Sequence, residues 1–268
     1  MSDIITTSSP VTLVTCYYEI KSKHSNLQYR KWIQMFLQNL QANIVIFTNN
    51  KLVRYLRRCT QHIQSKVHFI ICPFKKLDLY AKYLNIWKKQ YEMDPNKECG
   101  RTIGCYILWN SKFKFLKRAI DLNPFQTEKF IWNDIGNVRN LSQIEFLQNY
   151  PNLNKISNDQ IDIIYLDEYQ NLTQTFFQNE VHVSGSIFGG PKNLILELHT
   201  KYYQLLQKYV DNGKFIGCDQ QILSSLILEN KTKFNLIKPT NTIVNRWFWL
   251  YYYWGTDESD ETDESDGR

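Results

Sequence analysis

Short apolar runs alternate with amphipathic segments through the first half of the chain. Residues 11–18 (VTLVTCYY), 43–48 (NIVIFT) and 67–72 (VHFIIC) are rich in β-branched and aromatic side chains, which predicts buried strands. Between the first two runs, apolar residues recur at helical spacing after a candidate capping box formed by Ser25 and Gln28. A strand, helix, strand repeat favours parallel pairing, so we predict an α/β sheet with helices on its faces.

Amphipathic stretches recur in the rest of the chain. One follows the glycine-containing block VHVSGSIFGGP, and its apolar stripe continues until Asn212 and Gly213 stop it. In the CDQQILSSL stretch beyond it, Asp219 occupies a helix-capping position. The predicted helices after the second strand are residues 51–59, 77–91, 105–122, 141–150 and 194–209.

Two apolar runs end abruptly in carboxylates. In the KFIWNDIGNVR stretch the run ends at Asp134, and Gly136 frees the backbone just beyond it. The run at 161–166 ends at Asp167 and Glu168. This pair is a second candidate for a metal site, besides Asp134. Open α/β sheets bind ligands at the carboxyl ends of their strands, so we expect a ligand site at these ends.

Further polar residues are candidates for the same site. Thr15, Tyr17 and Thr48 lie at the ends of the first two predicted strands. Asn110 and Lys112 belong to a polar triplet within an otherwise apolar helix, where they could contact the base or the phosphates of a nucleotide. The exposed face of a helix is the alternative interpretation of that triplet.

The net charge of +6 hides an asymmetry. Residues 256–268 hold seven acids and one Arg, which leaves 31 basic against 19 acidic groups, or +12, in residues 1–255. We expect one domain over residues 1–255 and a disordered acidic tail over residues 256–268. The basic body should attract anions, either phosphorylated small molecules or nucleic acid, although the sequence contains no basic arm and no nucleic-acid motif.

Several classes of protein are disfavoured by absent patterns. No run approaches the ~20 apolar residues of a membrane span and the N-terminus lacks a signal-peptide pattern, so we expect a soluble, cytoplasmic protein. The six cysteines show no metal-ligand spacing and are expected to be reduced. Neither G-x-x-x-x-G-K-[ST] nor G-x-G-x-x-G occurs, so a nucleotide would be held by strand ends and a metal.

The order of these motifs resembles that of glycosyltransferases with the GT-A fold. A strand ending in WNDIG is followed about fifty residues later by GSIFGGP, a long helix and CDQQ. The chain is particularly similar to the HtrL/YibB-like family, which opens with a motif similar to VTCYYEI and has a second strand like IVIFT. IFGGP and CDQQ also resemble motifs of the blood-group-type retaining glycosyltransferases. The resemblance covers roughly residues 11–230. It implies a GT-A-like (Rossmann-like) α/β fold, a mixed, mostly parallel sheet flanked by helices.

The resemblance also implies roles for particular residues. GT-A enzymes hold a divalent cation and the donor diphosphate with a D-x-D pair, of which Asp134 matches the first acid and Gly136 replaces the second. We therefore expect either a Mn²⁺ or Mg²⁺ ion on Asp134 or contact of Asp134 with hydroxyls of the donor. Asp219 would hold donor-sugar hydroxyls or act as a base. Gln220 occupies the place of a glutamate in the blood-group-type enzymes.

The remaining implied roles concern the acceptor and the leaving group. The turn formed by Gly189 and Gly190 would border the sugar and the acceptor. Trp247 and Trp249, from the aromatic block RWFWLYYYW, would offer the acceptor a platform, and packing in the core is the alternative. The candidates for positive charge near the leaving diphosphate are Lys112, Arg139, Lys192 and Arg246.

We therefore predict a glycosyltransferase of the EC 2.4 class that uses a nucleotide-sugar donor, with a UDP-sugar favoured, and a glycan or other hydroxyl acceptor. A catalytically inactive nucleotide-sugar or glycan-binding protein is the first alternative, because the second acid is missing and Gln220 is not a carboxylate. A basic nucleic-acid-binding protein is the less favoured alternative. The donor sugar, the acceptor, the stereochemistry and the oligomeric state stay open.

Overall fold

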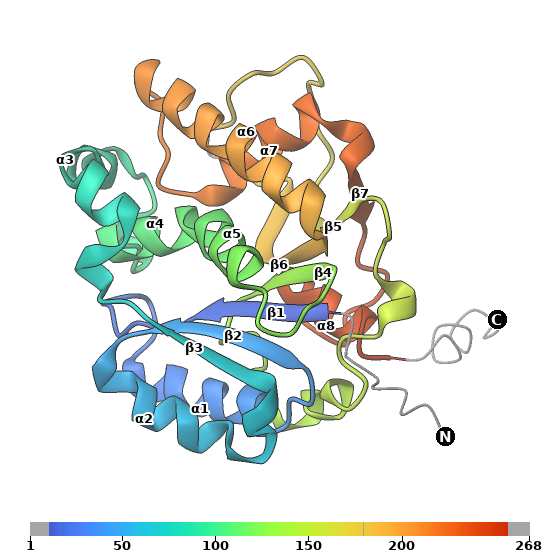
Figure 1. The fold of residues 1–268 in the computed structure, drawn as a ribbon. Helices are drawn as coiled ribbons and strands as arrows, with labels where there is room; N and C mark the ends of the chain where they lie inside the picture. The colour runs from blue at the N-terminus through green and yellow to red at the C-terminus, as the bar shows by residue number, and fades with distance from the viewer. Residues whose placement is uncertain (1–10, 179, 257–268) are drawn as a thin grey trace.

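A seven-stranded sheet runs through the computed structural model, which describes residues 11–178 and 180–256 (Figure 1). Except for Thr256, the predicted acidic tail lies outside the described residues. The strand order is β3-β2-β1-β4-β6-β5-β7. The strands are β1 (Val11–Cys16), β2 (Asn43–Thr48), β3 (Val67–Ile71), β4 (Lys129–Asn133), β5 (Ile161–Tyr165), β6 (Val183–Pro191) and β7 (Phe234–Ile237).

Most neighbouring strands are parallel. β1 lies between β2 and β4 and is parallel to both, and β3 is parallel to β2. β6 is antiparallel to both β4 and β5, whereas β5 is parallel to β7. Parallel neighbours need crossover connections, which the intervening helices provide. The predicted mixed, mostly parallel α/β sheet is confirmed.

Helices cover both faces of the sheet, with α1 and α2 on one face and α5 and α6 on the other (Figure 1). Leu13 of β1 packs in one hydrophobic core with Ile33 of α1, and its neighbour Val14 packs in the second core with Phe115 of α5. Successive side chains of a strand point to opposite faces, so a strand buried on both sides needs a continuous apolar run. The helices are α1 (Asn26–Leu37), α2 (Asn50–Cys59), α3 (Asp78–Met93), α4 (Ile103–Asn110), α5 (Lys112–Leu122), α6 (Lys192–Asp211), α7 (Asp219–Glu229) and α8 (Trp249–Tyr253).

The predicted helix over residues 105–122 is two helices in the structure. Ser111 separates α4 from α5, and its side-chain hydroxyl donates to the carbonyl of Ile107 at 2.6 Å. Its backbone N–H donates to the carbonyl of Leu108 at 3.1 Å, which closes a tighter turn than an α-helix has. Serine competes with the helix for its own backbone acceptors, and here the competition ends α4 and starts a new helix at Lys112.

The predicted helix over residues 141–150 is wrong. That stretch forms two 3-10 turns, Leu141–Gln143 and Glu145–Leu147. The Gln143 side chain accepts from the backbone N–H groups of Arg139 and Asn140, at 3.0 and 3.2 Å. Tyr150 also precedes a proline, which disfavours the helical conformation at that position.

Two features of the structure bear on the expected class of protein, namely the length of its helices and the state of its cysteines. None of the helices that the structure describes is long and apolar enough to cross a membrane. All six cysteines are free.

Candidate active site

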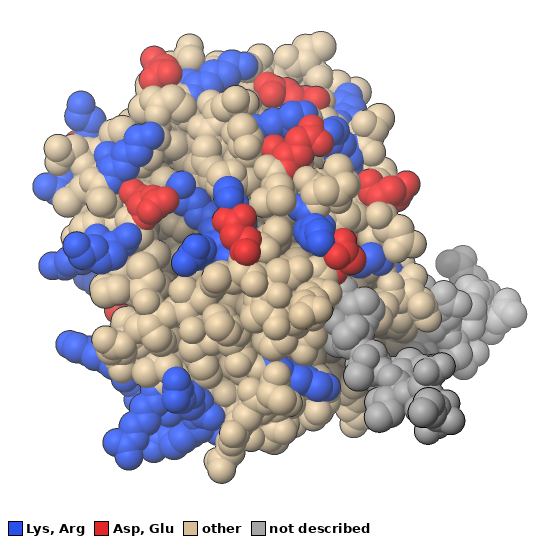
Figure 2. Space-filling model, in the orientation of Figure 1, with Lys and Arg blue, Asp and Glu red and all other residues tan. Residues whose placement is uncertain are grey.

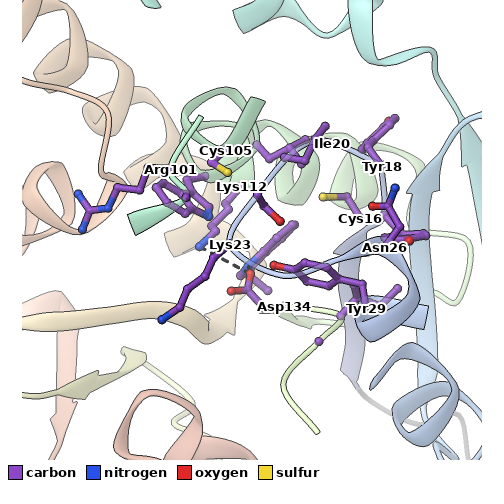
Figure 3. Close-up of a pocket in the computed structure, with 18 of the residues that line it drawn as sticks. Cys16, Tyr18, Ile20, Lys23, Asn26, Tyr29, Arg101, Cys105, Lys112 and Asp134 are labelled. Carbon is purple, nitrogen blue, oxygen red and sulfur yellow. Dashed lines mark hydrogen bonds and ion pairs between the residues drawn. The ribbon is translucent and has the colours of Figure 1, made fainter. Parts of the chain in front are cut away.

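The order in which the chain adds strands to the sheet reverses at β1. From β1 the chain passes to β2 and β3 on one side, and it later returns to β4 on the other side. In open α/β sheets the loops that leave two such strands separate at their carboxyl ends and create a crevice. The structure has a cavity of about 390 Å³ at this point, lined by residues that follow β1 and residues that follow β4 (Figure 3). Its volume lies in the range of small-molecule sites, roughly 300–1,000 Å³.

Asp134 directly follows β4 and faces the cavity. Its backbone N–H donates to the carbonyl of Ser186 at 2.8 Å, so β6 fixes the backbone at this point. The indole N–H of Trp132 donates to Asp134 Oδ1 at 2.8 Å, and 35% of the Asp134 side chain remains exposed. Burial of the carboxyl raises the pKa of Asp134, while Lys112 and the Trp132 donor oppose that rise.

Lys112 is the first residue of α5 and is 5% exposed. Its Nζ atom lies 2.7 Å from the carbonyl oxygen of Gly185 and 2.8 Å from Asp219 Oδ2. The same atom lies 3.7 Å from Asp134 Oδ1, and Figure 3 shows the two side chains close together. Burial acts to lower the pKa of Lys112, but the two carboxylates outweigh it and the pKa is raised. The ammonium group is therefore charged at neutral pH.

Asp219 does not line the cavity. It is the first residue of α7, whose N-cap is Cys218, so the predicted capping position is displaced by one residue. The side chain is 4% exposed and forms an ion pair with Lys112. A Cβ atom on Gly185 would lie 2.5 Å from Asp219 Oδ2, so the carboxylate fits only because residue 185 has no side chain.

Arg139 contributes a fixed positive charge to the cavity. Its Cζ atom lies 4.4 Å from the ring centroid of Trp32 and 4.6 Å from that of Phe248, so the guanidinium is held between two aromatic rings. Its Nε–H donates to the carbonyl of Gly136 at 3.2 Å. Within residues 11–178 and 180–256, no carboxylate forms an ion pair with Arg139, so the rest of its donor fork is available to an anion.

The cavity as a whole favours an anion with aromatic or sugar rings. Of the described residues, Asp134 is the one acid that lines it, against four basic side chains. Arg101 is also 3.4 Å from Asp94, and it lies with Lys23 toward one side of the cavity (Figure 3). The basic residues are Lys23, Arg101, Lys112 and Arg139, and the aromatic ones are Tyr17, Tyr18, Tyr29, Trp109, Trp132 and Phe248.

The structure brings together some of the residues that the sequence indicated. Those that line the cavity are Tyr17, Lys112, Asp134, Gly136 and Arg139. Those that do not line it are Thr15, Thr48, Asn110, Gly189, Gly190, Asp219, Gln220, Trp247 and Trp249.

Four of the predicted donor-binding and catalytic residues lie away from the cavity. Thr15 and Thr48 are fully buried in the sheet, and the Thr48 hydroxyl donates to the carbonyl of Tyr17 at 2.9 Å. The Asn110 amide donates to the carbonyls of Tyr106 and Ile216 and accepts from the Tyr202 hydroxyl, so it joins α4 to α6 and to the segment before α7. Gln220 accepts from the Cys218 thiol at 3.2 Å.

The predicted acceptor turn at Gly189 and Gly190 is instead the interior of β6. A Cβ on Gly189 would lie 2.4 Å from the carbonyl oxygen of Phe130, and one on Gly190 would lie 2.4 Å from that of Gln160. The glycines permit close packing of β6 against its neighbours and do not line the cavity.

Trp249 of the predicted aromatic platform is core, the alternative that the sequence left open. Trp249 is 2% exposed, and its indole N–H donates to Asn241 Oδ1 at 3.2 Å. Trp247 is half-buried, and its carbonyl accepts from the hydroxyls of Ser184 and Ser186. Phe248, between them, is the residue of this block that lines the cavity.

Sequence reasoning missed Lys23 and Arg101 because both lie in loops. Gly100 has a φ of +85°, and a Cβ on it would lie 2.5 Å from the Cα of Lys23. The glycine therefore allows the two loops to meet and form one wall of the cavity. Arg101 could have been found from the sequence, because it follows a glycine in a polar loop. No local pattern distinguished Lys23 from other exposed lysines.

The acidic pair Asp167 and Glu168 and two of the candidate cations form ion pairs on the surface. Asp167 lies 2.9 Å from Arg246, and Glu168 lies 2.9 Å from Lys238. Lys192 pairs with Glu128 at 2.6 Å. Of the four cations considered for the diphosphate, Lys112 and Arg139 are the two at the cavity.

The donor set fits a divalent ion poorly. Mn²⁺ and Mg²⁺ favour several oxygen ligands, commonly more than one carboxylate. In the described part of the chain, no three His, Cys, Asp or Glu residues converge on a point. Asp134 and Asp219, the two carboxylates closest to a possible ion at the cavity, both form ion pairs with the ammonium group of Lys112.

Comparison with known proteins identifies the family. The profile of a family described as "Bacterial protein of unknown function (HtrL_YibB)" matches residues 9–254. This protein therefore belongs to the HtrL_YibB family, which confirms the resemblance seen in the sequence. A search of curated proteins found no match.

Two solved structures align over most of the chain with low similarity. Mouse xyloside xylosyltransferase 1, in its apo form, has a TM-score of 0.47 and 9% identity over 90% of this chain and 93% of that chain. The 4-diphosphocytidyl-2C-methyl-D-erythritol synthase from Anaerococcus prevotii has a TM-score of 0.39 and 8% identity over 91% of this chain and 94% of that chain. Scores this low carry no argument about the present protein.

Proposed function

We propose that this protein is a GT-A-like glycosyltransferase that moves a sugar from a nucleotide-sugar donor to a hydroxyl group of a glycan or other acceptor. The observation that carries the proposal is the cavity between the carboxyl ends of β1 and β4, which combines one carboxylate, several cations and aromatic walls. A nucleotide sugar has a base that stacks on aromatic rings, a diphosphate that needs positive charge, and sugar hydroxyls that donate to a carboxylate.

The cavity residues suit these three parts of a donor. Arg139, held between two rings, is placed to bind a phosphate with its planar fork. Asp134 is a half-buried carboxylate at the cavity, with 35% of its side chain exposed, and it would accept hydrogen bonds from sugar or ribose hydroxyls. In the transfer, the bond from the anomeric carbon to the diphosphate oxygen breaks and a bond to the acceptor oxygen forms. The acceptor proton passes to a base, for which Asp134 is the candidate because burial raises its pKa.

A second candidate is a protein that binds the same donor without turnover. The observation that favours it is the ion pair of Asp219 with Lys112, which leaves Asp134 as the one carboxylate at the cavity among the described residues. Nucleic-acid binding is the weakest candidate. On the face that Figure 2 shows, basic side chains are interspersed with acidic ones, and one basic group gathers over α2. A continuous basic stripe that could follow a phosphate backbone is not visible on that face.

A thermal-shift panel of UDP-, GDP-, CMP- and TDP-sugars tests the proposal, with Asp134→Asn as the site variant. Asp121→Asn is the matched control, because Asp121 lies on the exposed side of α5 in an ion pair with Lys117. A ligand at ~100 times its Kd adds ~2.7 kcal/mol to the free energy of unfolding. We expect a shift for the wild type and for Asp121→Asn, and a reduced shift for Asp134→Asn.

Release of the nucleoside diphosphate from the ligand that binds separates the two candidates. Slow release that an acceptor accelerates supports a transferase. Binding with no release by the wild type supports the binding protein. If no nucleotide or nucleotide sugar shifts the wild type, the proposed function is wrong, and binding to DNA and RNA should be measured at two salt concentrations.

A further inference from the structure

Lys112 stands where a divalent ion would have to bind to connect Asp134 with a second carboxylate. Its ammonium nitrogen lies 2.8 Å from Asp219 Oδ2 and 3.7 Å from Asp134 Oδ1. We propose that this ammonium group is the built-in cation of the site, which contacts the diphosphate of the donor directly and makes donor binding independent of a divalent metal. The inference rests on the proposed function, because it concerns the diphosphate of the same donor.

The hydrogen bond that Lys112 forms within the described residues leaves donor capacity for a ligand. An ammonium group has three N–H donors. One donates to the carbonyl of Gly185 at 2.7 Å, and the ammonium nitrogen also forms an ion pair with Asp219 Oδ2 at 2.8 Å. The separation of 3.7 Å from Asp134 Oδ1 is too long for a hydrogen bond. Donors beyond the bond to Gly185 therefore remain for a ligand oxygen, and Lys112 lines the cavity in which that oxygen would lie.

Three separate elements hold the ammonium group in this place. The break at Ser111 starts α5 at Lys112, β6 supplies the Gly185 carbonyl, and α7 supplies Asp219. A cation with such support loses little conformational freedom when a ligand binds. Asp219 is thus a positioning residue for Lys112, since it is buried and does not line the cavity.

A divalent ion on Asp134 would be opposed by this arrangement. It would lie a few ångströms from the ammonium group, and like charges repel strongly where little water separates them. It would also have a single carboxylate, because Asp219 is already neutralised by Lys112. The missing second acid at Gly136 fits the same interpretation, since a site with its own cation has no need of a second metal ligand.

Donor binding with and without metal is the first test, and it uses the wild-type chain. Calorimetry with UDP, GDP, CDP and TDP is performed in excess EDTA and again with Mn²⁺. We expect Kd values that agree within ~3-fold between the two conditions, less than the loss of one charged contact would cause. A nucleotide that binds only with Mn²⁺ overturns the inference and leaves the proposed function standing. If no nucleotide binds under either condition, the proposed function fails and the inference fails with it.

The second test asks whether Lys112 contacts the diphosphate or only supports the fold. The probes are the monophosphate and the diphosphate of the nucleoside that binds best, with EDTA present. In Lys112→Met we expect the diphosphate to lose ~10–100-fold in affinity and the monophosphate to lose much less, so that the preference for the diphosphate shrinks. Lys117→Met, which removes an exposed charge from the same helix, should keep that preference. A preserved preference in Lys112→Met overturns the inference.

A metal-binding measurement needs neither a Lys112 variant nor a donor. Electron paramagnetic resonance should show that the wild type does not bind one equivalent of Mn²⁺ at Asp134. Asp134→Asn should therefore leave the binding of Mn²⁺ unchanged. If the wild type binds one equivalent of Mn²⁺ and Asp134→Asn does not, the site has a metal in place of a built-in cation. This result would overturn the inference even if Lys112→Met did not fold.

Discussion

Gly185 and Asp219 lie in direct contact, and a Cβ atom on Gly185 would meet Asp219 Oδ2 at 2.5 Å. Gly185 belongs to β6, and Asp219 is the first residue of α7. Lys112 contacts both, with 2.7 Å to the Gly185 carbonyl and 2.8 Å to the Asp219 carboxylate. The missing side chain at residue 185 therefore determines the place of the carboxylate, and the carboxylate determines the place of the ammonium group at the cavity.

Gly185→Ala should displace Asp219 and with it Lys112. We expect a loss of ~1–3 kcal/mol in the free energy of unfolding, typical of an overpacked buried position, and weaker binding of nucleoside diphosphates. Gly213→Ala is the control, because residue 213 has a φ of +62° and open space around it. That variant should lose ~1 kcal/mol through backbone strain and keep its nucleotide affinity. Urea denaturation and calorimetry measure both quantities, and equal affinities in the two variants would contradict the argument.

Breaking the buried ion pair should be costly, and removing both partners should be less so. Lys112→Met or Asp219→Leu alone leaves a buried charge unpaired, which costs ~3–5 kcal/mol in the free energy of unfolding. The double variant should cost at least ~1 kcal/mol less than the sum of the two single variants. The exposed pair Lys117 and Asp121, 2.7 Å apart, is the reference cycle and should show a coupling of only ~0.3–0.5 kcal/mol. Similar coupling in the two cycles would mean that the buried pair is solvated.

Arg139→Lys should weaken nucleotide binding more than it weakens the fold. The ammonium of a lysine keeps the charge but loses the planar fork held between Trp32 and Phe248, so we expect a ~10-fold rise in the Kd of a nucleoside diphosphate. Arg58→Lys, on the exposed side of α2, should leave the Kd unchanged. Calorimetry at low and moderate salt measures the effect. An unchanged Kd in Arg139→Lys would place the phosphates elsewhere.

Stability should fall as the pH rises through the titration of Asp162. This carboxyl is fully buried in β5 and accepts from the backbone N–H of Ser157 and the side chain of Asn235, and burial raises its pKa to about 6. The folded chain therefore holds this proton more tightly than the unfolded chain, whose Asp pKa is ~3.9. The contribution is complete below about pH 4 and is lost by about pH 6, a change of roughly 3 kcal/mol.

Asp162→Asn removes this titration and keeps the shape of the side chain. The difference in the free energy of unfolding between wild type and variant should grow in favour of the variant from pH 4 to pH 6, as measured by urea denaturation. Asp211→Asn, which removes an exposed carboxyl at the end of α6, is the control and should keep the pH dependence of the wild type. A constant difference between Asp162→Asn and the wild type would mean that Asp162 is ionised in the fold throughout this range.

The local pattern was sufficient for most elements and for part of the site. Residues 43–48 were predicted as a strand and form β2 with those limits, because a run of β-branched and aromatic residues suits a strand buried on both faces. Ser25 accepts from the N–H of Gln28 at 3.2 Å and caps α1 as predicted. Asp134 lies at the cavity because it follows a central strand, and strand ends can be located from the sequence.

Tertiary contacts overruled the local pattern at other residues. Gly189 and Gly190 have the composition of a turn, but they pair with β4, and the backbones of Phe130 and Gln160 approach them so closely that a side chain would not fit. Asn110 has the polarity of a ligand contact, but its amide joins three carbonyl and hydroxyl groups of the fold. A polar residue in an apolar helix can serve either purpose, and only its neighbours in space decide between them.

The sequence by itself determined the α/β class, the positions of the strands and the carboxylate at the end of β4, because periodicity and strand ends are properties of residues close together in the chain. Tertiary structure alone decided that Lys112 meets Gly185, 73 residues away, and that Asp219 faces the same ammonium group. These contacts depend on the placing of β6 beside β4 and of α7 against β6. The spacing of side chains along the chain does not encode those placements, so the sequence offered Lys112 as one of four candidate cations, and only the folded molecule showed which groups it contacts.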